Sequence, residues 1–311
     1  MAYPSNTFTG DGGDLDVFIP AVWGSKINDF YKAQLILADF FTNRSDELSG
    51  GGNIVYTPGI TEMTANAKSN ATAVTLNSPT ETSVTLTVAT WMEVSFQIED
   101  LEAAHVKRSY SIQETYAKNA AYTIGDTLES AISALFQAFS TVVGASDTNL
   151  ADSEIRQAIS TLDAAKVPGI YSGDVAFFLH PNTFWRQIQN IDKFSLAVNS
   201  PVNDPTAKKP MASLYGIPVF VSANLPVSTL ASATGGRCNA LAHKDAIHWA
   251  TLPLGVKSKS GGMVGKHGIR VQSNYVPEYL ATLTTVDICY GVIENRDTSG
   301  IWLNSISTAV A

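Results

Sequence analysis

The chain has 311 residues, of which 45% are hydrophobic and 15% are charged, and its formal net charge is −8. The length suits one large or two small folding units, but the charged share is well below the roughly 25% of an average globular chain. A negative chain argues against a nucleic-acid-binding module, which needs clustered Lys and Arg, although it leaves room for a container around nucleic acid. Charge depletion is typical of the buried centre of protein interfaces. An assembling protein is therefore favoured over a secreted or β-rich protein with a Thr- and Ser-rich surface.

Residues 1–24 predict an extended arm. They are rich in Gly, Asp, Ser and Thr and end in an apolar segment that contains Phe18 and Trp23. Aromatic side chains without local partners are typical of interface anchors, so we expect this arm to clasp a neighbouring subunit. The alternative is that Trp23 packs beneath a helix of its own chain. From Ser25, apolar residues at spacings of three and four predict a helix that ends near Asn43.

Residues 53–99 predict an extended β-hairpin. The strictest alternation of apolar and polar residues covers 84–98, and it predicts one strand about 50 Å long at about 3.3 Å per residue. Its expected partners are Ile54–Tyr56 and Ala73–Leu76, and the polar stretch Thr61–Asn70 suits the loop tip. An isolated hairpin is marginally stable because it cannot bury its own apolar face, so we expect a neighbouring molecule to cover it.

Three side chains of this β region are predicted intersubunit contacts. Lys68 lies in the loop tip, where a simple exposed lysine is the alternative. Trp91 and Met92 lie next to each other on the long predicted strand. With Phe18 and Trp23 of the arm, these residues make up the predicted contact set.

A long helix and a mixed α/β region follow. The apolar stripe predicts a helix over residues 111–143, with Ser111 and Glu114 as a capping box and Gly144 as its end. A helix of this length would form a rigid beam of roughly 45–50 Å. The remaining predictions are a helix at about 152–165, a strand at 175–179, a helix from the turn at 180–182 to 191, strands at 217–222 and 240–242, long strands from 269 to about 292, and a short strand near 302.

The histidines and cysteines form no metal or redox motif. His243 and His248 are five residues apart, a spacing that suits neither one helical face nor a zinc site, so we expect packed or surface histidines. Cys238 and Cys289, the only two cysteines, make no disulfide framework and favour a reducing compartment. The N-terminus lacks the pattern of a signal peptide, and no segment approaches the ~20 continuous apolar residues of a membrane span.

Two further candidates for chemistry are weak. Residues 261–267 resemble a phosphate-binding loop, but His267 replaces the hydroxyl that would meet magnesium, so a flexible glycine loop is expected. Glu99, Asp100 and Glu102 are better explained as a solvated acidic face than as a catalytic carboxylate pair. The sequence thus predicts no enzyme, no catalytic residue, no bound metal and no cofactor.

A motif in the C-terminal half resembles a signature of tailed-phage major capsid proteins. The pattern is Leu-x-Gly-x-Pro-Val, then a short apolar strand, then Ser or Thr and a Leu-Pro or Met-Pro pair. Gly216 and Pro218 would turn the chain into a buried strand that Pro226 ends. The order of the predicted elements is similar to that family over nearly the whole chain. The motif residues here are Leu214, Gly216, Pro218, Val219, Ser222 and Pro226.

The resemblance implies an α+β capsid fold of the Hong Kong 97 type. Its expected parts are an N-terminal arm (1–52), an extended β-hairpin loop (53–99), a peripheral domain (100–168) with the spine helix (111–143), an apical α/β domain (169–262) and returning peripheral strands (263–311). Some capsids cross-link a lysine of the extended loop to a neighbouring asparagine, but the sequence offers no partner for Lys68.

The resemblance also implies a function and partners. Hexamers and pentamers would build an icosahedral shell around double-stranded DNA without sequence-specific binding. Scaffolding, portal and possible decoration proteins would be partners, and the shell would assemble in the host cytoplasm and end in the virion. The alternatives are an encapsulin-like nanocompartment shell and another virion protein, such as a tail-tube or decoration protein. The long helix argues against the second alternative.

Overall fold

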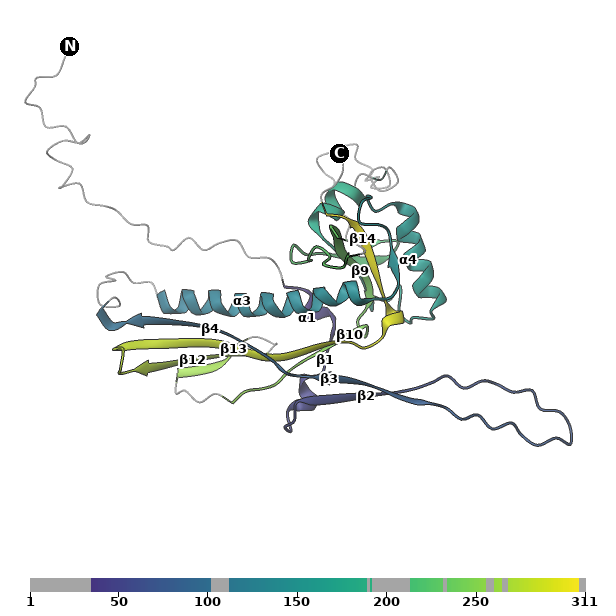
Figure 1. Ribbon diagram of the computed structural model, residues 1–311, viewed down its shortest axis with the longest axis horizontal. Coiled ribbons are helices and arrows are strands. Elements are labelled where there is room, and N and C mark those ends of the chain that lie inside the picture. The colour runs from purple at the N-terminus through teal and green to yellow at the C-terminus, as the bar shows by residue number, and fades with distance from the viewer. Residues whose placement is uncertain are drawn as a thin grey trace, which may run out of the picture.

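The computed structural model describes residues 35–101, 112–188, 191, 213–231, 234–255, 260–264 and 268–307. The predictions for Phe18, Trp23 and Ser111 lie outside these ranges. The described chain forms two six-stranded sheets and one two-stranded ribbon. The helix α3 (Ile112–Ala134) lies along one sheet, and the ribbon projects from the body of the molecule (Figure 1).

The sheet beneath α3 is called the long sheet here. Its centre is β13 (Ala281–Glu294), whose first part pairs on its two sides with β4 (Thr90–Glu99) and β12 (Ile269–Val276). The last part of β13 pairs with β10 (Ile247–Thr251). The remaining strands are β11 (Ser260–Val264) on β12 and β1 (Thr42–Asn43) on β10. The predicted long strands from residue 269 onward are thus confirmed.

The main core lies between α3 and the long sheet. Side chains alternate along a strand, so every second residue of β13 faces the apolar stripe of α3. The predicted stripe is confirmed, because the core includes Ile124, Leu128, Ile132, Val286, Ile288 and Tyr290.

The C-terminal end of the long helix differs from the prediction. α3 ends at Ala134, and a tighter 3₁₀ turn, η3 (Leu135–Ala138), follows it. Phe139 is extended, and β5 (Val142–Val143) pairs with β14, so the prediction of a helix to residue 143 is wrong. Phe136 in this turn and Phe139 just after it are both in the core, where their rings stack with centroids 6.3 Å apart.

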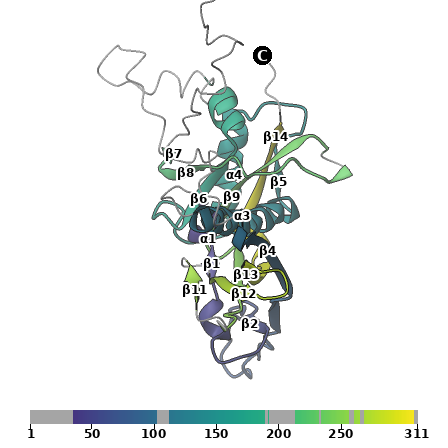
Figure 2. The same cartoon turned by 90° about the vertical axis from the view of Figure 1, so that its left-hand side faces the viewer.

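The second sheet, called the compact sheet, has the strand order β5-β14-β9-β6-β8-β7 and lies above the long sheet in Figure 2. Its face away from the main core packs against the helix α4 (Asp152–Ala164) and the π-helical turn η4 (Thr183–Ile188). The helix predicted at about 152–165 and the strand predicted at 175–179 are confirmed. The other strands of this sheet are β6 (Val175–Leu179), β7 (Ser213–Leu214), β8 (Ile217–Val221), β9 (Gly236–His243) and β14 (Gly300–Ile306).

The two sheets divide the chain at places other than the predicted domain limits. The helix α4, expected with the spine helix in residues 100–168, packs on the compact sheet. Strand β10, expected in residues 169–262, pairs within the long sheet. The chain therefore changes sheet in the short segments between β9 and β10 and between β13 and β14.

The projecting ribbon consists of β2 (Ile54–Ile60) and β3 (Glu81–Thr87). One uninterrupted strand over residues 84–98 was expected, but the strand breaks after Thr87, and β4 pairs with β13 instead. The ribbon therefore covers residues 54–87 and not 53–99. Ala73–Leu76, the second expected partner, is not a strand but part of the loop between β2 and β3.

The break occurs where the chain crosses β13 at Gly291. A Cβ at this position would overlap the carbonyl group of Thr87 and press on Val88. The buried side chain of Val88 and a hydrogen bond from its N–H to the carbonyl of Asn53 (2.8 Å) hold the crossing. The close approach of the two backbones moves the chain out of the ribbon and into the long sheet.

Two smaller predictions are also corrected. The helix expected to end near Asn43 is described only as the single turn α1 (Leu37–Phe40), and Thr42–Asn43 form a strand. The buried carboxylate of Glu129 holds α1 on α3, because it accepts the N–H groups of Leu37 and Ala38 at 3.0 Å each. The expected glycine loop contains β11, whose residues pair with β12. None of the described helices is long and apolar enough to cross a membrane.

Candidate intersubunit surfaces

The projecting ribbon shares buried side chains with the body at its base, and beyond the base an exposed ion pair joins Glu62 to Lys166 (3.6 Å). A small cluster at the base buries Leu48, Val55, Leu86, Val88 and Ala250 between the ribbon and the long sheet. Beyond the base, large apolar side chains remain between 62% and 86% exposed, and these are Tyr56, Ile60, Met63, Val74 and Leu76. A run of exposed apolar side chains on an extended element is typical of a surface that a partner covers.

Lys68 lies near the tip of this loop, as predicted, but its ammonium group forms hydrogen bonds within the loop. Its Nζ donates hydrogen bonds to the carbonyl of Ser69 (2.8 Å) and to the carbonyl of Thr72. These bonds fold the side chain over the turn at Asn70–Ala71. The residue is exposed, and its contribution to an interface stays a prediction.

Trp91 is exposed yet held in one orientation. Its ring is 66% exposed on the face of β4 away from α3, while its Nε1–H donates to Oδ2 of the buried Asp287 (2.9 Å). Arg270 binds the same carboxylate through Nε (2.8 Å) and Nη2 (2.6 Å). An exposed aromatic ring that is fixed before binding loses little conformational entropy on association, which is a property of interface anchors.

Met92, the neighbour of Trp91, points to the other face of the long sheet. It pairs with Ile288, a member of the core beneath α3, and its side chain remains 40% exposed. The alternation over residues 84–98 predicted that these two neighbours point to opposite faces of the strand. The structure places them on opposite faces, so they cannot form a single contact.

A further exposed apolar patch lies at the end of the long sheet, where β4 ends and β12 turns into β13. Asp100 is bonded to two of its members: its Oδ2 accepts the hydroxyl of Tyr275 (2.8 Å), and its N–H donates to the carbonyl of Leu280 (3.0 Å). Of the predicted acidic face, Asp100 is thus hydrogen-bonded within the subunit, and Glu102 lies outside the described residues. The patch itself was not predicted, although Tyr275, Tyr279 and Leu280, at the turn between β12 and β13, were a signal for it. Its members are Leu101, Tyr116, Tyr275, Tyr279 and Leu280.

The motif at residues 214–226 helps to build the compact sheet. Tyr215 and Gly216 both have positive φ angles, +50° and +84°, which makes the tight turn between β7 and β8. Leu214 and Ser222 are buried, and the N–H of Ser222 donates to the carbonyl of Leu179 (3.0 Å). Pro218 and Val219 lie within β8, and the carbonyl of Pro226 accepts the N–H of Cys238 (3.1 Å). The motif therefore specifies the turn and the strand that follows it.

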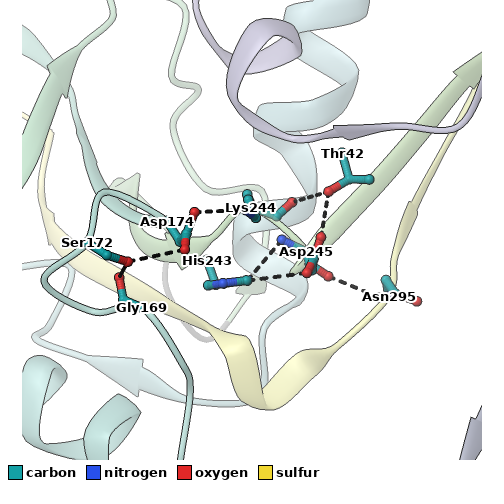
Figure 3. Close-up of polar contacts among 8 residues, drawn as sticks. All are labelled: Thr42, Gly169, Ser172, Asp174, His243, Lys244, Asp245 and Asn295. Carbon is teal, nitrogen blue, oxygen red and sulfur yellow. Dashed lines mark hydrogen bonds and ion pairs between the residues drawn. The ribbon is translucent and has the colours of Figure 1, made fainter.

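His243 and His248, which were expected to be packed or at the surface, are both buried, and His243 belongs to a polar cluster where the two sheets meet (Figure 3). The N–H of Asp245 donates to Nδ1 of His243 (3.1 Å), and Asp245 accepts Thr42 Oγ1 (2.6 Å) on its carboxylate. Lys244 pairs with Asp174 at 2.8 Å, and this bond raises the pKa of Lys244 and lowers that of Asp174. Burial lowers the pKa of His243, so the ring stays neutral and acts as an acceptor.

The two cysteines and the possible metal ligands of the described residues were the remaining candidates for chemistry. Both cysteines are free, and burial raises the pKa of Cys238 to about 11, which keeps the thiol protonated. Among the described residues, no group of three or more His, Cys, Asp or Glu could hold a metal ion.

No family model matches the chain, and no curated protein matches it in sequence. Solved structures do match it. A capsid chain of the cyanophage P-SCSP1u has a TM-score of 0.74 at 15% identity, with 98% of this chain and 97% of that chain covered. The mature capsid of bacteriophage PhiM1 gives 0.73 at 11% identity, with coverages of 98% and 97%. A chain of Mycobacterium phage Che8 gives 0.71 at 16% identity, with coverages of 94% and 98%.

These similarities extend over nearly the whole of both chains and include the long helix, the two sheets and the ribbon. The protein is thus of the α+β class. More particularly, it has the fold of the capsid proteins of tailed phages.

Proposed function

We propose that this chain is a major capsid protein, which self-assembles into an icosahedral shell around the double-stranded DNA genome of a tailed phage. The observation that carries the proposal is the likeness to phage capsid chains over the full length of both partners. Identities of 11–16% support a common fold, and the surfaces of this chain supply the argument for assembly.

The ribbon is the strongest argument for assembly. Its exposed apolar side chains would be costly on a free monomer, since burying each one would contribute roughly 1.5–3 kcal/mol. Its own chain offers only the small cluster at the base. A neighbouring subunit that covers the ribbon would bury these side chains, and each subunit would in turn cover the ribbon of another.

The long sheet offers two surfaces that suit such a neighbour. Trp91, fixed by Asp287, would be an aromatic anchor on one face. The patch around Asp100 would provide a second contact at the end of the sheet. We therefore assign Trp91 and this patch, together with the arm residues Phe18 and Trp23, to contacts between copies of the chain.

We further propose that hexamers and pentamers are the building units of the shell. Its partners would be scaffolding, portal and possible decoration proteins. The shell would be part of the virion and would assemble in the host cytoplasm. A net charge of −8 suits a wall that encloses DNA without binding particular sequences. We assign no catalytic activity to the chain, because the solved structures that it resembles are those of capsid chains.

Negative-stain microscopy of the purified full chain tests the proposal. We expect closed shells of uniform size, or rings of five or six subunits. A preparation that remains monomeric at high concentration would contradict assembly. Nucleic acid in purified particles would favour a phage shell, whereas enclosed cargo protein would favour the encapsulin-like alternative.

A further inference from the structure

The segment that leads into the ribbon is attached to the body at three points. It covers residues 35–48, is called the strap here, and contains α1, β1 and the 3₁₀ turn η2 (Ser45–Leu48). In Figure 1 it is the purple chain that runs from α3 past β1 to β2. Because β2 follows the strap after one short connection, the position of the strap determines where the ribbon begins.

The first attachment is to α3, where Gly125 and Glu129 lie one helical turn apart on the same side. A Cβ at Gly125 would come within 2.7 Å of Cδ1 of Leu35, so the glycine leaves room for this side chain. The carboxylate of Glu129 accepts the N–H groups of Leu37 and Ala38, one on each oxygen, at 3.0 Å. Both oxygens are acceptors, which fits an ionised carboxylate, because a protonated oxygen would be a donor.

The strap needs this carboxylate because α1 has no cap of its own. The first N–H groups of a helix have no acceptor within the helix, and Ile36, which precedes α1, makes no side-chain hydrogen bond to them. Leu37 and Ala38 are buried, and a buried N–H group without an acceptor costs free energy. Loss of the Glu129 carboxylate would therefore favour departure of α1 from α3.

The second attachment holds the middle of the strap between the two sheets. The ring of Phe41 packs on that of Phe178 in β6, with centroids 5.3 Å apart, and the carbonyl of Phe41 accepts Nε1–H of Trp249 in β10 (3.2 Å). The hydroxyl of Thr42 donates to the carboxylate of Asp245 (2.6 Å), as Figure 3 shows. The strap is thus bonded to the segment in which the chain passes from one sheet to the other.

The third attachment is at the base of the ribbon. Oγ of Ser45 accepts the N–H of Thr251 at the end of β10 (2.8 Å). Leu48 is 2% exposed and belongs to the small cluster that the ribbon shares with the body. Just beyond the strap, the carbonyl of Asn53 accepts the N–H of Val88, where the second strand of the ribbon returns to the body (2.8 Å). The end of the strap therefore supports both strands of the ribbon.

We propose that the strap holds the ribbon in place on the long sheet, and that Glu129 is the positioning residue that fixes the strap to α3. Glu129 acts on the ribbon through α1, Thr42 and Ser45, which follow one another along the strap. Few residues separate these attachments, so each one limits the movement of the next. When Glu129 no longer binds α1, the strap loosens as far as Leu48, and the base of the ribbon opens more often.

Two other contacts hold the ribbon, and both are independent of the strap. Val88 is buried where the chain crosses Gly291. The ion pair between Lys166 and Glu62 joins side chains that are 80% and 84% exposed, so water screens it and it contributes little. A loosened strap should therefore leave a ribbon that is more mobile but still attached at Val88. This inference concerns the chain itself and does not depend on the proposed function.

Hydrogen exchange of the full chain tests the proposal with the variant Glu129→Gln. Glutamine has the shape of glutamate but one oxygen acceptor where two are used. We expect exchange at least about tenfold faster than in the wild-type chain at the amides of Leu37, Thr42 and Val88. The amides of β6 should keep their wild-type rates. Glu278→Gln, which changes an exposed glutamate in the turn after β12, is the control and should exchange as the wild-type chain does.

The rate at Val88 decides the outcome. Faster exchange at Leu37 with a wild-type rate at Val88 would overturn the proposal, because the effect of Glu129 would end before the ribbon. A wild-type rate at Leu37 would also overturn it. So would an equal acceleration in β6, since Glu129 would then stabilise the whole subunit and not the strap in particular.

A second variant gives the same test if Glu129→Gln does not fold. Thr42→Val removes the hydroxyl that binds Asp245 and keeps the shape of the side chain. We expect exchange at Val88 at least about threefold faster than in the wild-type chain, with β6 unchanged. Thr123→Val, on the exposed side of α3, is the control. A wild-type rate at Val88 in Thr42→Val would overturn the proposal.

Discussion

At the scale of single residues, small side chains and buried polar groups decide where the chain can cross itself. Gly291 is one example, since the backbone of Thr87 and Val88 passes directly over it. Glu129 is another, because its carboxylate is 1% exposed and accepts two N–H groups of α1. Burial outweighs these hydrogen bonds and raises the pKa of Glu129. Both residues join segments that are distant in sequence.

Replacing Gly291 with Ala should destabilise the protein. The added methyl group would overlap the carbonyl of Thr87, and overpacking of this kind costs about 1–3 kcal/mol. Chemical denaturation gives the free energy of unfolding for the variant and the wild-type chain. Gly50→Ala is the control, because a Cβ at Gly50 meets nothing within 4 Å. Equal stability of the two variants would show that the backbones at Thr87 and Gly291 can move apart without a measurable loss of stability.

His248 should make stability depend on pH in the acid range. Its side chain is 2% exposed, and among the described residues its Nε2 has no hydrogen-bond partner. Burial, and then the charge of Arg44, lower its pKa, so the folded state binds fewer protons than the unfolded state. Stability is therefore complete above the ordinary pKa of about 6.5 and falls as the pH drops below it.

The test is the melting temperature of the wild-type chain and of His248→Phe between pH 7 and pH 5. The variant cannot take up a proton at this position, so its melting temperature should fall less over this range. A variant that loses stability as steeply as the wild-type chain would show that other groups cause the acid effect.

At the scale of elements, α3 and the ribbon have opposite roles. The helix buries one apolar stripe in the core of its own subunit. The ribbon exposes most of its apolar side chains and shares a core with the body only at its base. Damage to the helix should therefore lower the stability of the subunit, whereas damage to the ribbon should affect assembly.

Leu128→Ala tests the role of the helix. Leu128 is 1% exposed, and large-to-small changes at such core positions cost about 2–5 kcal/mol. The measurement is the free energy of unfolding in chemical denaturant. Ser130→Ala, on the exposed side of α3, should change stability by less than about 0.5 kcal/mol. A negligible loss for Leu128→Ala would contradict the packing described for this helix.

Shortening the ribbon tests its role in assembly. Ile60 pairs with Glu81, so an Asn-Gly turn in place of residues 61–80 would close the two strands directly. The removed loop carries Met63, Val74 and Leu76 but no buried core residue. The subunit should keep its melting temperature but form no closed shells in electron micrographs. Normal shells from this variant would exclude the loop from the assembly contacts.

At the scale of the whole molecule, the low share of charged residues and the exposed apolar side chains favour an assembled protein over a soluble monomer. The net charge is −8, and only 15% of residues are charged. The described body has two well-packed cores, one on each side of the compact sheet. Large exposed apolar side chains lie on the ribbon, on the long sheet and at its end, and also around the compact sheet, where Tyr171 and Trp185 are examples.

Free subunits should not bind duplex DNA at physiological salt, because no excess of positive charge is available to displace the counterions of the phosphates. A gel-shift assay with purified subunits and a random-sequence duplex measures this. Lowering the salt should produce little additional binding. A shift at nanomolar protein concentration would contradict the charge argument.

The sequence by itself predicted the elements whose pattern is local. The stripe of α3, the helix at about 152–165 and the buried strand at 175–179 each follow from the spacing of apolar residues along a few turns or pleats. The motif at residues 214–226 likewise predicted a turn and a strand, because Gly216 tolerates the positive φ that this turn requires. Periodic burial leaves a mark in the sequence wherever one face of an element meets the core.

Only the tertiary structure decided which elements pair and which side chains meet. Alternation continues through Val88, so the sequence does not show that β3 stays in the ribbon while β4 joins β13. Trp91 binds Asp287 across 196 positions of sequence, a distance over which spacing carries no information. Strand pairing and burial of charge are set by contacts between distant segments, and the chain makes those contacts only once it has folded.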